Sequence, residues 1–143
     1  YQLFRRAVER VPIPALSLDM RGALTDLAKA ITAAAQERYW LHDTVGRHIA
    51  MPHGTLPPRL ARWWEWPDGA ALANALGWTK TAGPRPDLGL TWLTDSLATD
   101  QQLTGTIIRL ETRLNQIVYE AFQLTAAEVT LIESTTQYPY GQL

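Results

Sequence analysis

Three histidines, His42, His48 and His53, are the residues of this sequence best suited to holding a metal ion. The first two are six residues apart, so they do not share a face of a helix with 3.6 residues per turn. Helical zinc sites pair histidines at i and i+4, and the sequence has neither such a pair nor any cysteine. We therefore expect no metal site and interpret the histidines as ordinary surface or half-buried side chains.

Aromatic and basic side chains lie together in the middle of the chain. Trp63, Trp64 and Trp66 are flanked by Arg59 and Arg62. Such a group can stack on the bases or sugars of a nucleic acid while the arginines contact phosphates. The tryptophans can also anchor a loop onto a hydrophobic core. Both interpretations stay open, and we favour the anchor.

A second basic group, Arg5, Arg6 and Arg10, lies near the start of the sequence. Arginine neutralises phosphates and so contributes DNA affinity that does not depend on base sequence. A row of surface arginines is also common in proteins that bind no DNA. Since the formal net charge is -1, any DNA contact must be local.

Catalytic motifs are absent from the sequence. No Ser or Cys lies in a nucleophile-elbow context, and there is no Gly-rich phosphate-binding loop. An enzymatic site in the Trp-rich middle would have only His53, Glu65 and Asp68 as titratable groups. We expect no catalytic residue in this segment.

Length and hydropathy indicate one soluble domain. The chain has 143 residues and no apolar run near the roughly 18 residues that span a bilayer, so we expect a cytoplasmic protein. It opens with "YQLFRRAVERVPIP", without Met and inside a half-apolar stretch. We therefore expect a fragment of a longer chain.

Apolar residues recur at spacings of three and four in two long segments, which predicts helices with apolar stripes. The first stripe consists of Leu24, Leu27, Ile31, Ala34, Arg38, Leu41 and Val45. The second, which we call the seam, consists of Leu103, Ile107, Leu110, Leu114, Ile117 and Leu124. The fold class predicted is mainly α, with two long antiparallel helices forming a coiled-coil-like scaffold and short helices and Trp-rich loops between them.

The predicted organisation is a single helical domain over 1–143. Its parts are an extended lead-in (1–18), a long helix (19–51), loops and short helices (52–96), a helix pair (97–134) and a tail (135–143). Ser17 and Asp19 are helix-start signals, "LGLTWLTDSL" predicts a short helix after Asp87, and Thr125-Ala-Ala-Glu128 has the spacing of a capping box.

Two stretches, "FRRAVERVPIPALS" and "LETRLNQIVYEAFQLTAAEVTLIE", together resemble the C-terminal region of large N6-adenine DNA methyltransferases of restriction-modification and phage-defence systems, including type IIG enzymes. The residues that match the closing pattern of this family are Glu111, Leu114, Asn115, Val118, Tyr119, Leu124, Thr125, Glu128, Ile132 and Glu133. The family's usual Tyr-Gly before Leu-Thr is Phe122-Gln123 here.

The resemblance implies a bacterial parent protein that methylates adenine in double-stranded DNA with S-adenosylmethionine. The family's Asn-Pro-Pro-Tyr-like tetrapeptide and its cofactor loop are absent from these residues. The segment would then need no cofactor of its own and would serve as a helical scaffold joining the target recognition domain to the remaining methylase domains. The rival hypothesis is a helical protein interaction module with no role on DNA.

Overall fold

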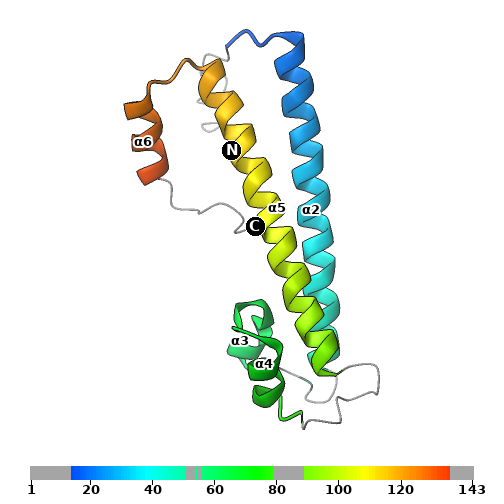
Figure 1. Ribbon diagram of the computed structural model, residues 1–143. Helices are drawn as coiled ribbons and strands as arrows, with labels where there is room; N and C mark the ends of the chain where they lie inside the picture. The colour runs from blue at the N-terminus through cyan, green and yellow to red at the C-terminus, as the bar shows by residue number, and fades with distance from the viewer. Residues whose placement is uncertain (1–13, 51–53, 55, 79–88, 136–143) are drawn as a thin grey trace, which may run out of the picture.

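Two long helices, α2 (Leu18–Ala50) and α5 (Leu90–Ala121), lie side by side and run antiparallel in the computed structural model, which describes residues 14–50, 54, 56–78 and 89–135 (Figure 1). The shorter elements are α3 (Pro58–Ala61), the 3-10 turn η1 (Trp63–Glu65), α4 (Gly69–Ala75) and α6 (Ala126–Thr135). No strand occurs in the described residues. The predicted fold class, mainly α with two long antiparallel helices and short helices between them, is confirmed.

Helix α2 begins where the sequence predicts it. The Ser17 hydroxyl oxygen accepts a hydrogen bond from the Met20 N–H at 3.2 Å, which satisfies one of the unpaired donors of the first turn. The helix ends at Ala50, before Pro52, as the sequence predicts. These bounds lie within one residue of the prediction.

Helix α5 begins at Leu90, so the short helix predicted after Asp87 is the first part of α5, and α5 crosses the predicted boundary between 52–96 and 97–134. The apolar spacing of the seam continues backward through Leu97 and Leu93, both of which are buried. Threonines in this stretch remain helical by donating to the carbonyl four residues earlier, as Thr94 does to Leu90 at 2.9 Å. One continuous stripe therefore produces one continuous helix.

The core is uneven along the helix pair. Its largest cluster lies where the last turns of α2 and the first turns of α5 meet the Trp-rich segment, and it contains Val45, Ile49, Trp63, Leu72, Ala73, Leu76, Leu93 and Leu97. Farther along the seam, Ile107 and Ile117 are buried, whereas Leu103, Leu110, Leu114 and Leu124 are only half-buried. Among the described residues, a third layer therefore covers the helix pair at this end.

The short helix α4 supplies part of this third layer. The Asp68 carboxylate caps it by accepting from the Ala71 N–H at 2.7 Å. Its last turn closes at Gly77, whose φ of 70° is left-handed, and the Trp78 N–H donates to the Ala73 carbonyl at 2.9 Å. This closure is a Schellman motif, in which glycine adopts the left-handed backbone without strain.

The corner between α5 and α6 repeats the same motif with a different residue. The Leu124 N–H donates to the Tyr119 carbonyl and the Gln123 N–H to the Glu120 carbonyl, both at 3.0 Å, while Gln123 has a φ of 54°. Beyond the corner, the capping box is confirmed. The Thr125 N–H donates to Glu128 Oε2 at 2.8 Å, and the Glu128 N–H donates to the Thr125 hydroxyl at 3.4 Å.

None of the helices in the described part of the chain combines the length and the hydropathy that crossing a membrane requires.

Gly69 sets the contact between α4 and α5, and its replacement gives a direct test of that packing. A Cβ atom there would overlap the Thr94 hydroxyl and lie 2.9 Å from the Thr94 backbone nitrogen. We expect Gly69→Ala to lower the free energy of unfolding by about 1–3 kcal/mol, as overpacking does. Chemical denaturation measures this change.

Gly22→Ala is the matched control, because a Cβ at Gly22 meets no atom within 4 Å. Since Ala is the better helix former, this variant should be up to about 1 kcal/mol more stable. Equal effects of the two substitutions would show that close approach of α4 to α5 is not what glycine provides at residue 69.

Candidate functional site

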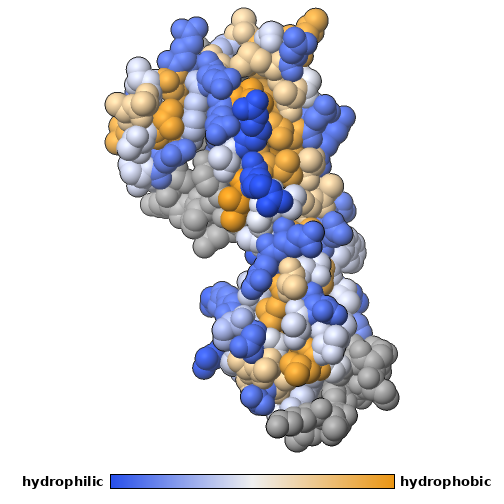
Figure 2. Space-filling model, viewed as in Figure 1, coloured by the Kyte–Doolittle hydropathy of each residue, from blue (hydrophilic) through white to orange (hydrophobic). Residues whose placement is uncertain are grey.

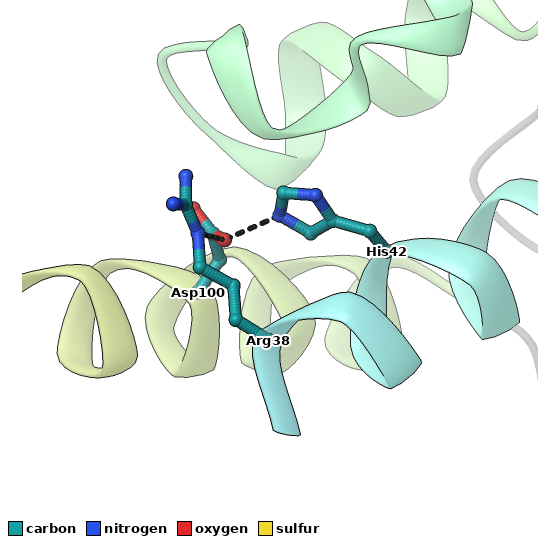
Figure 3. A network of polar contacts seen from close by, with 3 residues as sticks. All are labelled: Arg38, His42 and Asp100. Atoms are coloured by element: carbon teal, nitrogen blue, oxygen red, sulfur yellow. Dashed lines mark hydrogen bonds and ion pairs between the residues drawn. The ribbon is translucent and has the colours of Figure 1, made fainter. Parts of the chain in front are cut away.

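A cluster of three charged or ionisable side chains lies inside the helix pair (Figure 3). Arg38 and His42, one turn apart on α2, both point at Asp100 of α5. Arg38 Nε donates to Asp100 Oδ1 at 3.0 Å, and His42 Nε2 lies 2.6 Å from the same oxygen. Arg38 and Asp100 are buried and His42 is half-buried. The cluster therefore joins two helices across 62 residues of sequence.

The two donors decide the charge of the carboxylate. Burial by itself raises the pKa of Asp100, but hydrogen bonds from His42 and Arg38 and the charge of Arg38 outweigh it, so the pKa lies below its ordinary value. Asp100 is consequently ionised at neutral pH. Because an ionised carboxylate only accepts hydrogen bonds, His42 Nε2 must carry the hydrogen of the short contact.

The tryptophans cover this cluster from the third layer. The Trp64 ring stacks on the His42 imidazole, with ring centroids 3.9 Å apart and planes 9° from parallel. Trp63 meets the same imidazole edge-on at 5.5 Å. His42 thus contacts Asp100 with its nitrogen and the η1 tryptophans with its ring. One side chain thereby ties α2, α5 and the Trp-rich segment together.

The tryptophans serve as an anchor, which is the interpretation favoured by the sequence. Trp63 is 0% exposed, and Trp64 and Trp66 are half-buried against the core cluster. A fully buried indole offers no face for stacking on a base. Trp63 and Trp64 also pack edge to face at 6.0 Å, a favourable geometry for two aromatic rings.

Arg59 and Arg62 are exposed, but each already has a partner. The Arg59 guanidinium lies 4.7 Å from the centroid of the Trp66 ring, and Trp66 Nε1 donates to the Arg59 carbonyl at 3.3 Å. Arg62 pairs with Glu65 at 3.2 Å. Exposed pairs of this kind are worth little and exchange readily with other charges, so both arginines remain accessible to a phosphate.

The other three candidates, Arg5, Arg6 and Arg10, lie outside the described residues. Of the five arginines, the structure therefore places only Arg59 and Arg62, which follow the last turn of α2 in the chain (Figure 1).

The residues considered for metal binding or catalysis do not gather. His42 binds Asp100, and His48 Nδ1 donates to the Thr44 carbonyl at 2.7 Å, while His53 lies outside the described residues. Glu65 pairs with Arg62 and Asp68 caps α4. Within the described ranges, no group of three His, Cys, Asp or Glu residues is arranged to hold a metal ion.

Sequence reasoning missed the partnership of Arg38 with Asp100. Arg38 occupies a position of the first apolar stripe, and Asp100 lies midway between Leu97 and Leu103 in the register of the seam. An isolated charge in each of two apolar stripes is the available signal, because a buried charge requires a partner. The three-residue and four-residue spacing predicts the two stripes, but it does not predict which residue of one stripe lies opposite which residue of the other.

Comparisons with protein-family models, with curated proteins and with solved structures give no match to this chain.

The contribution of the buried cluster to stability can be compared with that of an exposed Arg-Asp pair on α2. Asp100→Leu leaves Arg38 buried without its carboxylate, and we expect a loss of about 3–5 kcal/mol in the free energy of unfolding. Adding Arg38→Met to Asp100→Leu should recover most of the lost free energy of unfolding, since the double variant no longer buries an arginine without its carboxylate. Urea denaturation of the two single variants and the double variant completes the cycle.

The exposed pair Arg47 and Asp43 supplies the control. Asp43→Leu should cost less than about 1 kcal/mol. If Asp100→Leu and Asp43→Leu destabilise the protein equally, the cluster does not hold the two helices together.

Stability should fall at acid pH because of the lowered pKa of Asp100. Between the lowered pKa of Asp100 in the folded chain and the ordinary carboxyl pKa, the unfolded chain binds a proton at Asp100 and the folded chain does not. The free energy of unfolding therefore rises with pH through this range. The contribution of Asp100 is complete above about pH 5 and is lost as pH falls through the lowered pKa. We expect Asp100→Asn to flatten the acid limb of a plot of melting temperature against pH.

Glu128 must be controlled in that measurement. Hydrogen bonds from the Thr125 N–H and hydroxyl hold its pKa below its ordinary value as well. Glu128→Gln should change the acid limb less than Asp100→Asn, because Glu128 is fully exposed. An unchanged limb in Asp100→Asn would contradict the assignment.

Proposed function

We propose that this chain is a helical spacer within a larger protein similar to N6-adenine DNA methyltransferases, and that it holds a target recognition domain in register with the methylase body. Reading base edges requires recognition elements that keep their position against the groove, while phosphate contacts fix the register on the duplex. A spacer contributes to this by rigidity. The catalytic groups and the S-adenosylmethionine site would lie elsewhere in that larger protein.

The observation that carries the proposal is the locked α2/α5 pair. The helices contain 33 and 32 residues, and at 1.5 Å per residue each is about 50 Å long. Two such helices could slide or rotate along an apolar seam, because apolar contacts are not directional. The Asp100 carboxylate, bound to both Arg38 and His42, opposes that movement.

The corner between α5 and α6 is consistent with the resemblance. The closing pattern of the methyltransferase family carries glycine at the position of Gln123, and the backbone there is left-handed with a φ of 54°. Glycine adopts this conformation without strain, which explains why a sequence pattern would carry glycine at this position. The capping box of Thr125 and Glu128 belongs to the same pattern. The local geometry of this chain thus agrees with what the family's sequence would require.

Contact with DNA would come from the exposed arginines of α3 and the following turn. The Arg59 guanidinium lies over the Trp66 ring, and stacking keeps it extended while leaving it exposed. Arg62 is held by Glu65 and would exchange that partner for a phosphate. Arg5, Arg6 and Arg10 are the remaining candidates.

One feature favours a protein interaction module instead. Tyr39 and Trp40 of α2 are 65% and 56% exposed, and their rings pack edge to face at 5.8 Å. Tyrosine and tryptophan are enriched at the centres of protein interfaces, where they provide most of the binding energy. In this second hypothesis the helix pair presents the aromatic pair to another protein.

Duplex binding by the chain distinguishes the two functions. We expect fluorescence anisotropy to show binding that weakens by roughly tenfold between 50 and 200 mM salt if two phosphates are contacted. Combining Arg59→Ala with Arg62→Ala should weaken binding and reduce the salt dependence, and Arg47→Ala is the matched control because Arg47 is an exposed arginine outside the candidate set.

The scaffold part of the proposal has its own variant. Leu110→Asp combined with Leu114→Asp places two charges in the seam, and binding should then fall together with the helical circular dichroism signal. Salt-insensitive or undetectable binding by the intact chain would favour the interaction module, in which Trp40→Ala abolishes capture of a partner protein.

A further inference from the structure

Helix α2 carries exposed apolar side chains on the side opposite its buried residues. The buried residues of α2, among them Ala34 and Val45, lie on one side of the helix. At 3.6 residues per turn, the opposite side carries a second row of residues, which we call the outer stripe. The outer stripe consists of Leu18, Thr25, Lys29, Thr32, Gln36 and Trp40, and all six are exposed. Leu18 is 83% exposed and Trp40 is 56% exposed. An exposed tryptophan on a helix face is typical of a protein interface.

Small side chains occupy the middle of the outer stripe. A shallow depression there is lined by Thr25, Ala28, Lys29, Thr32, Ala33 and Gln36. The Thr25 and Thr32 hydroxyls each donate to the carbonyl four residues earlier at 2.8 Å, so their hydrogen bonds are made within the helix. Small side chains at a contact allow two helix axes to approach closely.

Figure 2 shows hydrophilic and hydrophobic side chains mixed along the edge of the molecule that α2 forms in Figure 1. An interface on this face would therefore combine an aromatic centre with charged neighbours, as non-obligate protein interfaces do. The arrangement of those charges indicates which partner fits.

The charges of α2 are arranged so that the helix complements itself. In an antiparallel pair related by a two-fold axis, residues that lie opposite each other have numbers with a constant sum, since the two helices run in opposite directions. A sum of 65, that of Thr32 and Ala33, places the axis near the middle of α2. Three pairs of opposite charge then lie within one residue of this sum: Lys29 with Glu37, Arg21 with Asp43, and Asp19 with Arg47.

Like charges do not meet in this register. Asp26 lies opposite Tyr39, and Trp40 lies opposite Thr25, whose small side chain leaves room for an indole ring. A parallel pair in register would place each charge beside its own copy, and that arrangement is repulsive. Asp43 and Arg47 pair with each other within α2, but exposed pairs of this kind exchange readily. The charge pattern therefore favours a second, antiparallel copy of α2.

We propose that two copies of this chain associate through the outer stripes of their α2 helices, antiparallel and about a two-fold axis near Thr32. Trp40 of each copy packs on Thr25 of the other, and Lys29 of each copy pairs with Glu37 of the other. The association uses a face of α2 that does not pack on α5, and it does not involve Arg59 or Arg62. It therefore holds or fails separately from the proposed DNA contact.

Sedimentation velocity over a range of protein concentrations tests this self-association, and a reversible equilibrium between monomer and dimer is expected. Trp40→Ala should weaken dimerisation by roughly tenfold or more, since a central tryptophan provides much of the binding energy of an interface. The helical circular dichroism signal should not change, because Trp40 is exposed. Leu131→Ala is the matched control, because Leu131 is an exposed apolar residue of α6 and should leave dimerisation unchanged.

Charge reversal tests the register. Lys29→Glu and Glu37→Lys each place like charges opposite one another at two equivalent positions of the dimer, and each should weaken dimerisation by roughly fivefold. The combined variant exchanges the two signs and should recover the affinity of the unmodified chain. Recovery by the combined variant is expected only if Lys29 of one copy lies opposite Glu37 of the other.

Disulfide formation tests the orientation, for which the chain is suited because it has no cysteine. Thr32→Cys should form a bridge between two copies, because the two Thr32 residues lie beside the axis. Thr25→Cys is the matched control, since Thr25 is an exposed threonine with the same hydrogen bond. In the antiparallel pair the two Thr25 residues are separated by about 20 Å along the helices, which is too far for a bridge.

Each of the other outcomes overturns the proposal. A chain that stays monomeric up to about 1 mM does not use this face for self-association. A dimer that Trp40→Ala and the charge reversals leave unchanged uses a different face, and equal bridging by Thr25→Cys and Thr32→Cys would show a parallel pair. If Trp40→Ala abolishes capture of another protein while the chain itself is monomeric, the outer stripe binds that protein and not a second copy.

Discussion

A single carboxylate oxygen in the middle of an apolar seam governs how the long helices meet. Asp100 Oδ1 accepts from Arg38 and from His42, so it fixes both the rotation and the axial position of α5 against α2. Leucine and isoleucine contacts alone would tolerate a shift by one helical turn, because the apolar stripe repeats at that interval. A shifted pairing would leave Asp100 and Arg38 buried without partners, and the cost of that state selects the observed register. This role resembles that of buried polar residues that set register in coiled coils.

The third layer depends on the same interaction. The His42 ring that bonds to Asp100 also stacks on Trp64, and Trp63 meets the same imidazole edge-on. The Trp-rich segment is consequently part of the core, although its loops and breakers suggest a surface element. The space between the ends of the two long helices and the short helix α4 is wide, and few residues are available to fill it. Large aromatic rings fill such a space efficiently, which accounts for the many tryptophans of this segment.

The two ends of the helix pair differ in a way that bears on function. At the tryptophan end, three layers surround a cluster that includes Ile49 and Leu93, both 0% exposed. At the opposite end, the seam leucines are half-buried and α6 has no buried residue. A spacer requires one end that is fixed internally and another that joins its neighbour. In the proposed spacer, the surface around α6 is where such a junction would form.

The sequence determined by itself the features that depend on neighbours a few residues away. Ser17, Asp68 and the pair Thr125 and Glu128 cap helices because their side chains reach backbone N–H groups two or three residues on, whatever the rest of the chain does. The apolar spacing likewise gave the two long helices and their antiparallel pairing. Tertiary structure decided the features that join distant residues: the pairing of Arg38 with Asp100, the burial of Trp63 and the approach of Gly69 to Thr94. The periodicity of the sequence indicates which face of a helix is apolar. Only the packing of the elements determines which residue on another element lies opposite each position of that face.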